Sequence, residues 1–433
     1  MADAGARVPQ PLGDLSLSPD APRERARPSR AWPGVGLGSL TGVASDRRTG
    51  DRGAASDPLL HRDHVSRRRR AGHRQRRRPA GCREDARALE GDAGPHRARG
   101  LKRPVARATL AASARADQEG LMAELFETLT GVTAAYRDLG DRGLLRLTGV
   151  DRVRFLNGML SNDVSTLVPG ETCYALQLNR KGRILADLIV LALEESLLLD
   201  LAVGTSTEVS QFLGRHIIAD DVIFDDWSQD WGRLGLEGPG VGDALLKQGL
   251  PRPEPGRFER VQRDGREWLL LREGNLTPEG LQVLGPREAL AGLPSDLGLE
   301  PLAEDAAEVL RIEAFLPAYG TDVSERNFPA EARLERAVSY SKGCFIGQEI
   351  VARIRSRGAV KRFLTQIRAE APLEVGTTIR VDGTDVGRIT SAAVSPVAGP
   401  VALGYVRAAE ATLGTSLDLD GVAGVIVGPP SEP

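Results

Sequence analysis

The chain of 433 residues has only three cysteines, Cys82, Cys173 and Cys344, and they lie far apart in the sequence. No two of them form a C-x-x-C motif. This scarcity and spacing exclude a disulfide framework and a cysteine metal site of the usual spacing within one chain. We therefore expect free thiols.

Histidine is almost as scarce, because four of the five histidines precede residue 122 and only His216 follows it. His216 has no second ligand or triad partner within sequence reach, so neither a Ser/His/Asp hydrolase nor a histidine metal site is supported. The phosphate-binding pattern G-x-x-x-x-G-K-[ST] is also absent. No metal ion is predicted.

Long apolar runs are missing as well, since no stretch approaches the 18 residues of a membrane-spanning helix. No signal peptide precedes Met122, where the composition becomes that of a folded protein. These two absences predict a cytoplasmic protein that does not associate with membranes.

Residues 1–121 contain no Phe, Tyr, Ile or Asn and a single Trp32, so they have almost nothing with which to build a core. They carry 25 Lys and Arg against 14 Asp and Glu, whereas residues 122–433 carry 32 against 45. The arginine clusters 67–70 and 76–78 permit a nucleic-acid arm or a targeting peptide. With 52 arginines against five lysines in the chain, the alternative we favour is an Arg-rich extension upstream of the true start, or else a disordered tail.

Residues 122–357 show short apolar segments in the manner of a strand meander with packed helices. Strands are predicted at 144–150, 173–178, 184–193, 197–203, 222–227 and 233–236, with a hairpin over 260–271 and helices after Asp151 and over 208–217. Consecutive strands without long intervening helices indicate an antiparallel sheet. The predicted class of this region is α+β.

Residues 358–433 have a different pattern, in which six short strands follow one another. They are expected at 363–367, 378–381, 386–389, 402–406, 417–419 and 422–427. Short strands separated by turns such as Asp382-Gly383 are typical of a small barrel. A domain boundary is therefore predicted near residues 358–361.

The densest chemical signal is Lys342-Gly343-Cys344-Phe345-Ile346-Gly347-Gln348-Glu349, which runs into an amphipathic segment that is predicted to be helical. A cysteine near a helix N-terminus and two residues from Lys342 is expected to favour the thiolate form. For an isolated cysteine, the alternative is a small buried apolar residue without chemistry.

This octapeptide resembles the K-G-C-[FY]-x-G-Q-E signature of the YgfZ family, folate-binding relatives of the glycine-cleavage T-protein. The resemblance extends over about residues 140–408, including the Asn179–Ile184 turn, the 311–314 and 319–322 motifs and the 386–391 segment. It implies interleaved α+β subdomains and a terminal barrel around a central channel that binds folate. It also implies an auxiliary role in iron–sulfur cluster assembly or repair, with iron–sulfur client or assembly proteins as partners.

The resemblance assigns the pterin-binding acid to Glu313 of the R-x-E-A motif. A pterin presents its 2-amino group and a ring N–H side by side, and one carboxylate can accept both. Arg311 and Tyr319 lie in the same motifs, and the cationic turn of Asn179, Arg180 and Lys181 is a candidate for the carboxylate tail of tetrahydrofolate. A helix-end ion pair of Glu313 with Arg311, and a solvated loop, are the structural alternatives.

Asp187 decides between two functions. The T-protein resembles G-G-x-x-D-D in this strand, where an aspartate assists methylene transfer to tetrahydrofolate, and here Ala186 replaces the first acid of the pair. Asp187 nevertheless interrupts an apolar strand, where a carboxylate needs a partner or a function. Three hypotheses follow: a YgfZ-type factor with a functional Cys344, a tetrahydrofolate-dependent aminomethyltransferase, and a catalytically silent folate-binding scaffold. The first predicts a protein that is not a classical enzyme.

Overall fold

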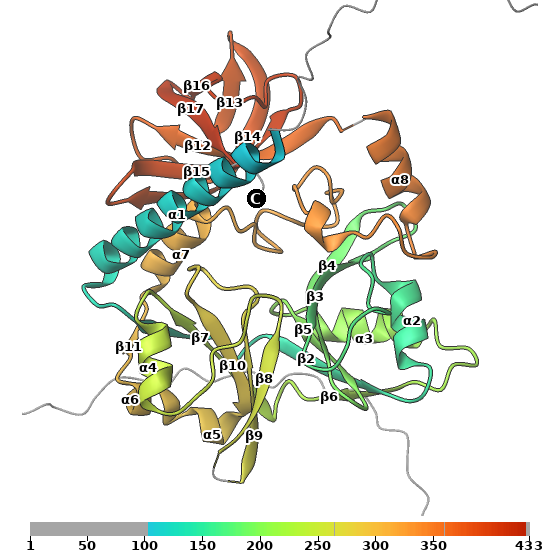
Figure 1. Cartoon of the computed structure of the whole chain (residues 1–433). Helices are drawn as coiled ribbons and strands as arrows, with labels where there is room; N and C mark the ends of the chain where they lie inside the picture. The colour runs from blue at the N-terminus through green and yellow to red at the C-terminus, as the bar shows by residue number, and fades with distance from the viewer. Residues whose placement is uncertain (1–102, 264, 359, 430–433) are drawn as a thin grey trace, which may run out of the picture. The chain divides into compact units, whose positions relative to one another are not determined.

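The computed structural model of the protein describes residues 103–263, 265–358 and 360–429 (Figure 1), with side chains from residue 117 onward. The arginine clusters and Cys82 of the predicted N-terminal extension lie outside the described residues. No helix within the described residues is long and apolar enough to cross a membrane.

The first helix crosses the position at which the sequence suggested a boundary. Helix α1 spans Arg103–Thr130, so residue 122 lies inside it. Its last turns bury Met122, Leu125 and Phe126 against helix α7 (Glu304–Glu313). The helix therefore belongs to the packed core at its C-terminal end.

Two antiparallel sheets are built from interleaved parts of the chain (Figure 1). The first has the order β11-β1-β7-β10-β9-β8, with only β1 and β11 parallel. Its strands are β1 (Ala135–Asp138), β7 (Trp231–Glu237), β8 (Phe258–Arg263), β9 (Arg266–Leu271), β10 (Leu281–Pro286) and β11 (Glu300–Pro301). The chain leaves this sheet after β1 and returns to it at β7.

The second sheet is formed between these two visits and has the order β3-β4-β5-β2-β6. Its strands are β2 (Gly143–Thr148), β3 (Thr172–Leu178), β4 (Ile184–Ala192), β5 (Leu197–Leu201) and β6 (Ile223–Asp226). Strands were thus predicted at or near β2 to β9, whereas β1, β10 and β11 were not predicted. The interleaved antiparallel α+β class is confirmed.

The remaining helices cover the sheets or connect them. They are α2 (Arg152–Met159), α3 (Ser206–Gly214), α4 (Val241–Lys247), α5 (Arg287–Leu290), α6 (Leu293–Leu297), the 3-10 helix η1 (Glu335–Ala337) and α8 (Gln348–Arg357). Helix α8 follows the K-G-C-F-I-G-Q-E motif as predicted, and Gly347 is its N-cap with a left-handed φ of 86°.

The C-terminal strands close into a six-stranded barrel of order β12-β15-β14-β13-β16-β17, which confirms the predicted barrel. Its strands are β12 (Arg362–Ala369), β13 (Thr378–Val381), β14 (Thr384–Ser395), β15 (Gly399–Arg407), β16 (Ser416–Leu419) and β17 (Val422–Gly428). Strands β14 and β15 are longer than the sequence pattern suggested. Ile312 of α7 packs against barrel side chains that include Leu364 and Leu403.

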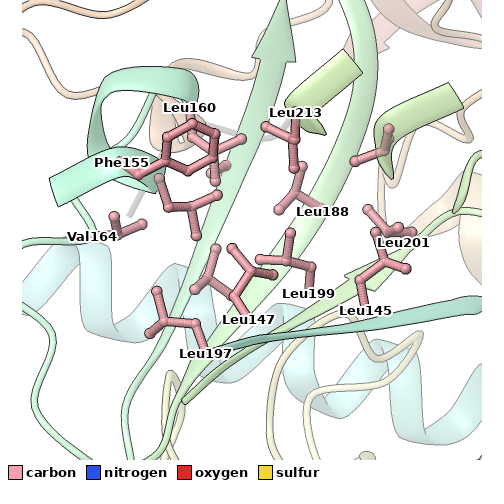
Figure 2. Close-up of a cluster of buried hydrophobic side chains, with 14 of the residues drawn as sticks. Leu145, Leu147, Phe155, Leu160, Val164, Leu188, Leu197, Leu199, Leu201 and Leu213 are labelled. Atoms are coloured by element: carbon pink, nitrogen blue, oxygen red, sulfur yellow. The ribbon is translucent and has the colours of Figure 1, made fainter. Parts of the chain in front are cut away.

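The second sheet is buried on both faces, which explains the almost continuous apolar character of β4 and β5. Figure 2 shows one face, where side chains such as Leu188 and Leu199 meet Phe155 of α2 and Leu213 of α3. On the other face, side chains that include Ile189, Leu191 and Leu198 pack against Leu269, Leu271 and Leu284 of the first sheet. Strand β4 therefore alternates between a helix-facing side and a side that faces the other sheet.

A buried ion cluster joins the two sheets. Asp200 on β5 is 1% exposed and accepts two hydrogen bonds from Arg142, from Nε and from an Nη atom, each at 3.0 Å. Arg233 on β7, itself 4% exposed, forms an ion pair with the same carboxylate. Burial lowers the pKa of Arg233 to about 10, so the guanidinium stays charged at neutral pH. One carboxylate thus compensates two arginines, one of them from the opposite sheet.

We expect Asp200→Asn to destabilise the protein by about 3 to 5 kcal/mol, because it leaves two buried cations without their counter-ion. Urea unfolding monitored by circular dichroism measures the loss. Glu349→Gln is the matched control, since the Glu349–Arg353 pair of α8 is exposed and such pairs contribute about 0 to 1 kcal/mol. Equal losses of unfolding free energy in the two variants would contradict the proposed contribution of the Asp200 cluster to stability.

Candidate functional site

The apolar space between the two sheets continues into a cavity of about 1200 Å³ whose wall carries both polar and apolar side chains. Asp187 and Ile189 of β4 lie on the face directed toward the first sheet, and Gln282 of β10 lies on the face that also carries Leu284. Asp187, Ile189 and Gln282 line the cavity, whereas Leu191 and Leu284 lie in the closed part of the intersheet space. The cavity is therefore an extension of the intersheet space in which polar side chains join apolar ones in the wall.

Asp187 is an acid of the cavity wall, and its carboxylate is largely buried. Its Oδ2 accepts a hydrogen bond of 3.1 Å from the hydroxyl of Tyr174, while its Oδ1 is buried and has no hydrogen-bond partner within the described part of the chain. Burial raises the pKa of Asp187, and the positive charge of Arg142 opposes that rise. A carboxylate with a raised pKa and a free oxygen in a cavity is a candidate functional group.

A line of polar side chains extends from Asp187 along the cavity wall. Arg336 lies over the ring of Tyr174 with its guanidinium carbon 4.7 Å from the ring centroid, and it pairs with Glu273 at 3.1 Å. Burial raises the pKa of Tyr174 well above its usual value, so the hydroxyl remains a donor to Asp187. The side chain of Arg336 is 58% exposed, which places this cation where the cavity meets solvent.

Two further arginines of the wall are held by acids behind it. Arg142 is bound to Asp200, and Arg137 forms a 3.0 Å ion pair with the fully buried Glu237. Glu237 also accepts hydrogen bonds from the backbone of Leu276 and Thr277. These contacts fix the positions of both guanidinium groups at the cavity.

The predicted pterin-binding acid lies elsewhere. Both carboxylate oxygens of Glu313 accept hydrogen bonds of 2.7 Å from Arg368 of the barrel strand β12, and Glu313 does not line the cavity. Its partner is thus Arg368 rather than Arg311. The ion pair connects the end of α7 to the barrel, and the assignment of the pterin to Glu313 finds no open carboxylate here.

Arg311 lines the cavity, but its donors are occupied. It binds Glu308, Asp322, Ser391 and the carbonyl of Leu316, at 2.6–2.8 Å. The acids Glu308 and Asp322 raise the pKa of Arg311 above its usual value despite its burial. The structure therefore gives Arg311 the position of a support for the wall.

Tyr319, a predicted ligand-binding residue, also lines the cavity, and its hydroxyl donates a hydrogen bond to the carbonyl of Leu185. The turn of Asn179, Arg180 and Lys181 lies away from the cavity wall. Asn179 Oδ1 accepts hydrogen bonds from the backbone of Lys181 and Arg183, and the side chains of Arg180 and Lys181 are exposed. The structure thus brings Asp187, Arg311 and Tyr319 together and leaves this turn apart.

Lys342 is a buried anchor. Its ammonium group donates hydrogen bonds to the carbonyls of Asn157, Leu160 and Asn162 at 2.6–2.8 Å, around the end of α2. Burial lowers the pKa of Lys342 to about 8, so the charged form still dominates at pH 7. The ammonium group is thus directed at these three carbonyls rather than at Cys344.

Cys344 is exposed on the loop before α8 and does not line the cavity. The loop is held by a close backbone approach, since a Cβ on Gly347 would lie 2.6 Å from the carbonyl oxygen of Asn179 and 3.1 Å from Gly182 Cα. Only glycine fits at residue 347, which also has a positive φ. Gly347 thus lies against the Asn179–Arg183 turn, and Cys344 is exposed on the loop that precedes it.

No group of three or more His, Cys, Asp or Glu side chains that could hold a metal ion occurs in the described ranges. The cavity instead offers carboxylate, phenol, amide and guanidinium groups. It can therefore bind an organic ligand with N–H donors on one edge and an acidic group elsewhere.

Sequence reasoning missed Tyr174, Gln282, Glu273 and Arg336. The strand register pairs Leu176 with Asp187 and Tyr174 with Ile189, so Tyr174 is the diagonal neighbour of Asp187 on the same face. That position follows from the hairpin register of β3 and β4 and was in principle predictable. The other three come from distant segments and carry no comparable signal.

Asp187→Asn should stabilise the fold at pH 7.5, on the order of 1 kcal/mol, as expected for functional groups that are held in unfavourable surroundings. The folded-state pKa of Asp187 is raised, so ionisation above about pH 4 costs stability in the wild type and not in the variant. The gain should therefore shrink as the pH falls toward 4. Thermal unfolding at pH 4.5 to 8 measures it.

Asp420→Asn provides the control for this pH dependence. The pKa of Asp420 is lowered by hydrogen bonds from the Thr378 backbone and from Arg380, so its charge stabilises the fold above about pH 4 and that contribution is lost on acidification. The two variants should change the melting temperature in opposite directions. A loss of stability in Asp187→Asn at all pH values would show that the carboxylate has a structural role.

Cys344 should react with iodoacetamide at pH 7.5 at least about tenfold faster than Cys173. Burial raises the pKa of Cys173 to about 11, which leaves little thiolate, whereas Cys344 is exposed. Peptide mapping by mass spectrometry separates the sites and also distinguishes Cys82. Equal labelling of Cys173 and Cys344 would contradict the exposure difference.

Comparison with known proteins places this architecture in a family. Residues 98–249 match the GCVT N-terminal domain, and residues 362–427 match the glycine cleavage T-protein C-terminal barrel domain. The chain is 30% identical over 297 residues to an aminomethyltransferase of Streptomyces coelicolor, covering 64% of this chain and 79% of that protein. It is 28% identical over 298 residues to a putative chloroplastic transferase of Arabidopsis thaliana, covering 67% and 69%.

Among solved structures, the aminomethyltransferase T of the glycine cleavage system from Bartonella henselae is similar, with a TM-score of 0.65 and 25% identity. The match covers 71% of this chain and 89% of that one. The fold agrees with these matches, because it has the interleaved sheets and the closed barrel in the matched regions. The chain belongs to the glycine cleavage T-protein family.

Proposed function

We propose that this protein binds a tetrahydrofolate derivative in the cavity beside Asp187 and acts as a YgfZ-type auxiliary factor in the assembly or repair of iron–sulfur proteins. The observation that carries the proposal is the unpaired, buried Oδ1 of Asp187 in a cavity of about 1200 Å³. The T-protein family binds tetrahydrofolate derivatives, so the ligand class agrees with the family.

The lining of the cavity supports a flat, polar heterocycle with an acidic tail. Aromatic side chains of Tyr174, Phe315 and Tyr319 contribute apolar surface, and Asp187 contributes an acceptor for ring N–H groups. Arg336, exposed at the solvent side and paired with Glu273, is a suitable partner for a carboxylate of the tail. A reduced folate carries all three features.

The auxiliary role rests on Cys344. The thiol lies on the exposed loop before α8, outside the cavity lining, where a partner protein can reach it. Lys342 and Gly347 hold that loop from within, so a partner would meet a positioned thiol. Ligand binding and thiol chemistry are then assigned to separate parts of the protein.

A second candidate is a tetrahydrofolate-dependent aminomethyltransferase of the glycine cleavage system. It is favoured by Asp187 itself, which lies in the cavity where the transferase needs an acid, and by relatives that are named aminomethyltransferases. Against it stands Ala186, which occupies the position of the first acid in the G-G-x-x-D-D pattern. This candidate needs no thiol, so Cys344 distinguishes the two.

Titration of the full chain with tetrahydrofolate by isothermal calorimetry tests the shared part of both candidates. We expect saturable binding that Asp187→Asn weakens about tenfold to a hundredfold, the range for a hydrogen bond to a charged acceptor. Asp420→Asn, on an exposed turn of the barrel, should bind like the wild type. Absence of binding by the wild type would remove both candidates.

Two activity measurements then separate the candidates. The auxiliary role predicts that Cys344→Ala loses the ability to restore iron–sulfur enzyme activity in cells that lack the protein, with folate binding unchanged. The transferase predicts turnover of an aminomethylated carrier protein that Asp187→Asn abolishes and Cys344→Ala leaves intact. Full restoration by Cys344→Ala would overturn the auxiliary role.

A further inference from the structure

Exposed cations from three parts of the chain lie near the loop that carries Cys344. They come from the turn between β3 and β4, from the loop at residue 326 and from helix α8. We call these six side chains the basic face: Arg180, Lys181, Arg326, Arg353, Arg355 and Arg357. Within the described residues, four of them form no ion pair: Arg180, Lys181, Arg326 and Arg357.

Close contacts hold the three parts of the basic face together. A Cβ on Gly182, in the turn, would lie 3.2 Å from Ile350 Cβ of α8. From the same turn, Arg183 donates a hydrogen bond of 2.6 Å to the carbonyl of Arg326. The turn also approaches the loop before α8 at Gly347, so the cations and the exposed thiol belong to one region of the surface.

The basic face is opposite in sign to the rest of the folded part. Residues 122–433 carry 32 Lys and Arg against 45 Asp and Glu, a net charge of −13. Two exposed acids, Glu325 and Glu349, adjoin the face. The six cations and these two acids contribute +4, which leaves −17 for the remaining residues. A negatively charged partner is therefore repelled by most of the molecule and attracted here, which orients its approach.

A structural reason accounts for some of these cations but not for all. Arg355 and Arg357 lie in the last turn of α8, where cations are favoured by the helix dipole. Arg180 and Lys181 lie in a turn between two strands, and Arg326 lies in a loop, so no helix dipole favours them. Their exposed charges beside the thiol loop indicate a partner outside the chain.

The basic face suits an acidic protein better than a nucleic acid. Proteins that bind single strands stack the bases on exposed aromatic rings. Here Arg355 lies over Tyr340, with its guanidinium carbon 3.8 Å from the ring centroid. Arg183 covers Phe328 in the same way, at 3.6 Å. Glu349, exposed among the cations and paired with one of them, would also repel a phosphate backbone.

We propose that the basic face is the docking surface for an acidic protein partner, which it brings to Cys344. The inference rests on the proposed auxiliary role, because it names the surface and the charge of the partner that the thiol meets. Carboxylates of the partner pair with the guanidinium and ammonium groups that have no acid of their own. The turn of Arg180 and Lys181 then receives side chains of a protein rather than the tail of tetrahydrofolate.

The probes are two short peptides that each carry one cysteine as a mixed disulfide with thionitrobenzoate. One peptide has glutamates where the other has glutamines. The Cys344 thiolate attacks the sulfur of the peptide, a disulfide forms between protein and peptide, and thionitrobenzoate leaves with the electron pair of the broken bond. The absorbance of thionitrobenzoate measures the rate on the full chain. Subtracting the rate of Cys344→Ala removes the contribution of the other thiols.

At low salt the wild type should react about tenfold faster with the glutamate peptide than with the glutamine peptide, because opposite charge raises the encounter rate. The ratio should fall toward one at about 1 M salt, where the Debye length is about 3 Å. The double variant Arg180→Gln with Lys181→Gln should lower the low-salt ratio about threefold. If this variant does not fold by circular dichroism, Arg353→Gln with Arg357→Gln decides in the same way.

The matched control removes two exposed cations outside the basic face, by Lys247→Gln with Arg266→Gln. It changes the net charge of the chain by the same amount and should keep the wild-type ratio. Equal rates of the two peptides with the wild type, or equal losses of the ratio in both double variants, would overturn the docking surface. So would a single-stranded RNA that inhibits the reaction more strongly than a cysteine-free glutamate peptide of equal charge, because the face would then bind nucleic acid.

A measurement in cells distinguishes this inference from the function on which it rests. Arg180→Gln with Lys181→Gln should restore iron–sulfur enzyme activity less well than the control double variant does. Full restoration by Cys344→Ala would make the proposed function fail, whichever peptide reacts faster. If Cys344→Ala does not restore activity but the two double variants restore it equally, the proposed function stands and the docking surface alone is overturned.

Discussion

The carboxylate of Asp200 is the contact on which the arrangement of the two sheets depends. It is buried between Arg142 and Arg233, and the second of these belongs to the opposite sheet. Burying three charges is costly, and only their mutual pairing makes the arrangement tolerable. The same cluster positions Arg142 at the cavity wall, where its charge opposes the rise in the pKa of Asp187. Arg142 thus takes part in the buried ion cluster between the sheets and also influences the pKa of Asp187.

The intersheet space shows how a binding cavity is made from a core. Leu191 and Leu284 fill its closed part, and Asp187, Ile189 and Gln282 continue the same two faces into the open part. Replacing apolar side chains by polar ones removes burial that would stabilise the fold and leaves unpaired oxygens. Such groups persist where function requires them, which is why the unfavourable surroundings of Asp187 are informative.

The K-G-C-F-I-G-Q-E loop combines structural residues with one free thiol. Lys342 binds three carbonyls around the end of α2, Phe345 packs in a buried cluster with Val351, and Gly347 permits close contact with Asn179. Each of these three residues has a packing reason to be where it is. Cys344, in contrast, is exposed and belongs to none of the buried clusters of the described residues. The loop is therefore well suited to present a thiol.

The sequence by itself predicted most of the strands, the antiparallel α+β class and the barrel, because these depend on local alternation. It also singled out Asp187 as a charge within an apolar strand. It did not determine that Glu313 pairs with Arg368, 55 residues away, or that Lys342 binds carbonyls at residues 157–162. Nor did it reveal Gln282 as a neighbour of the cavity. Such pairings depend on how two sheets and a barrel pack, and each long side chain has several oppositely charged or polar candidates in the sequence. Only the tertiary structure selects among them, because burial makes one partner favourable and leaves the others solvated.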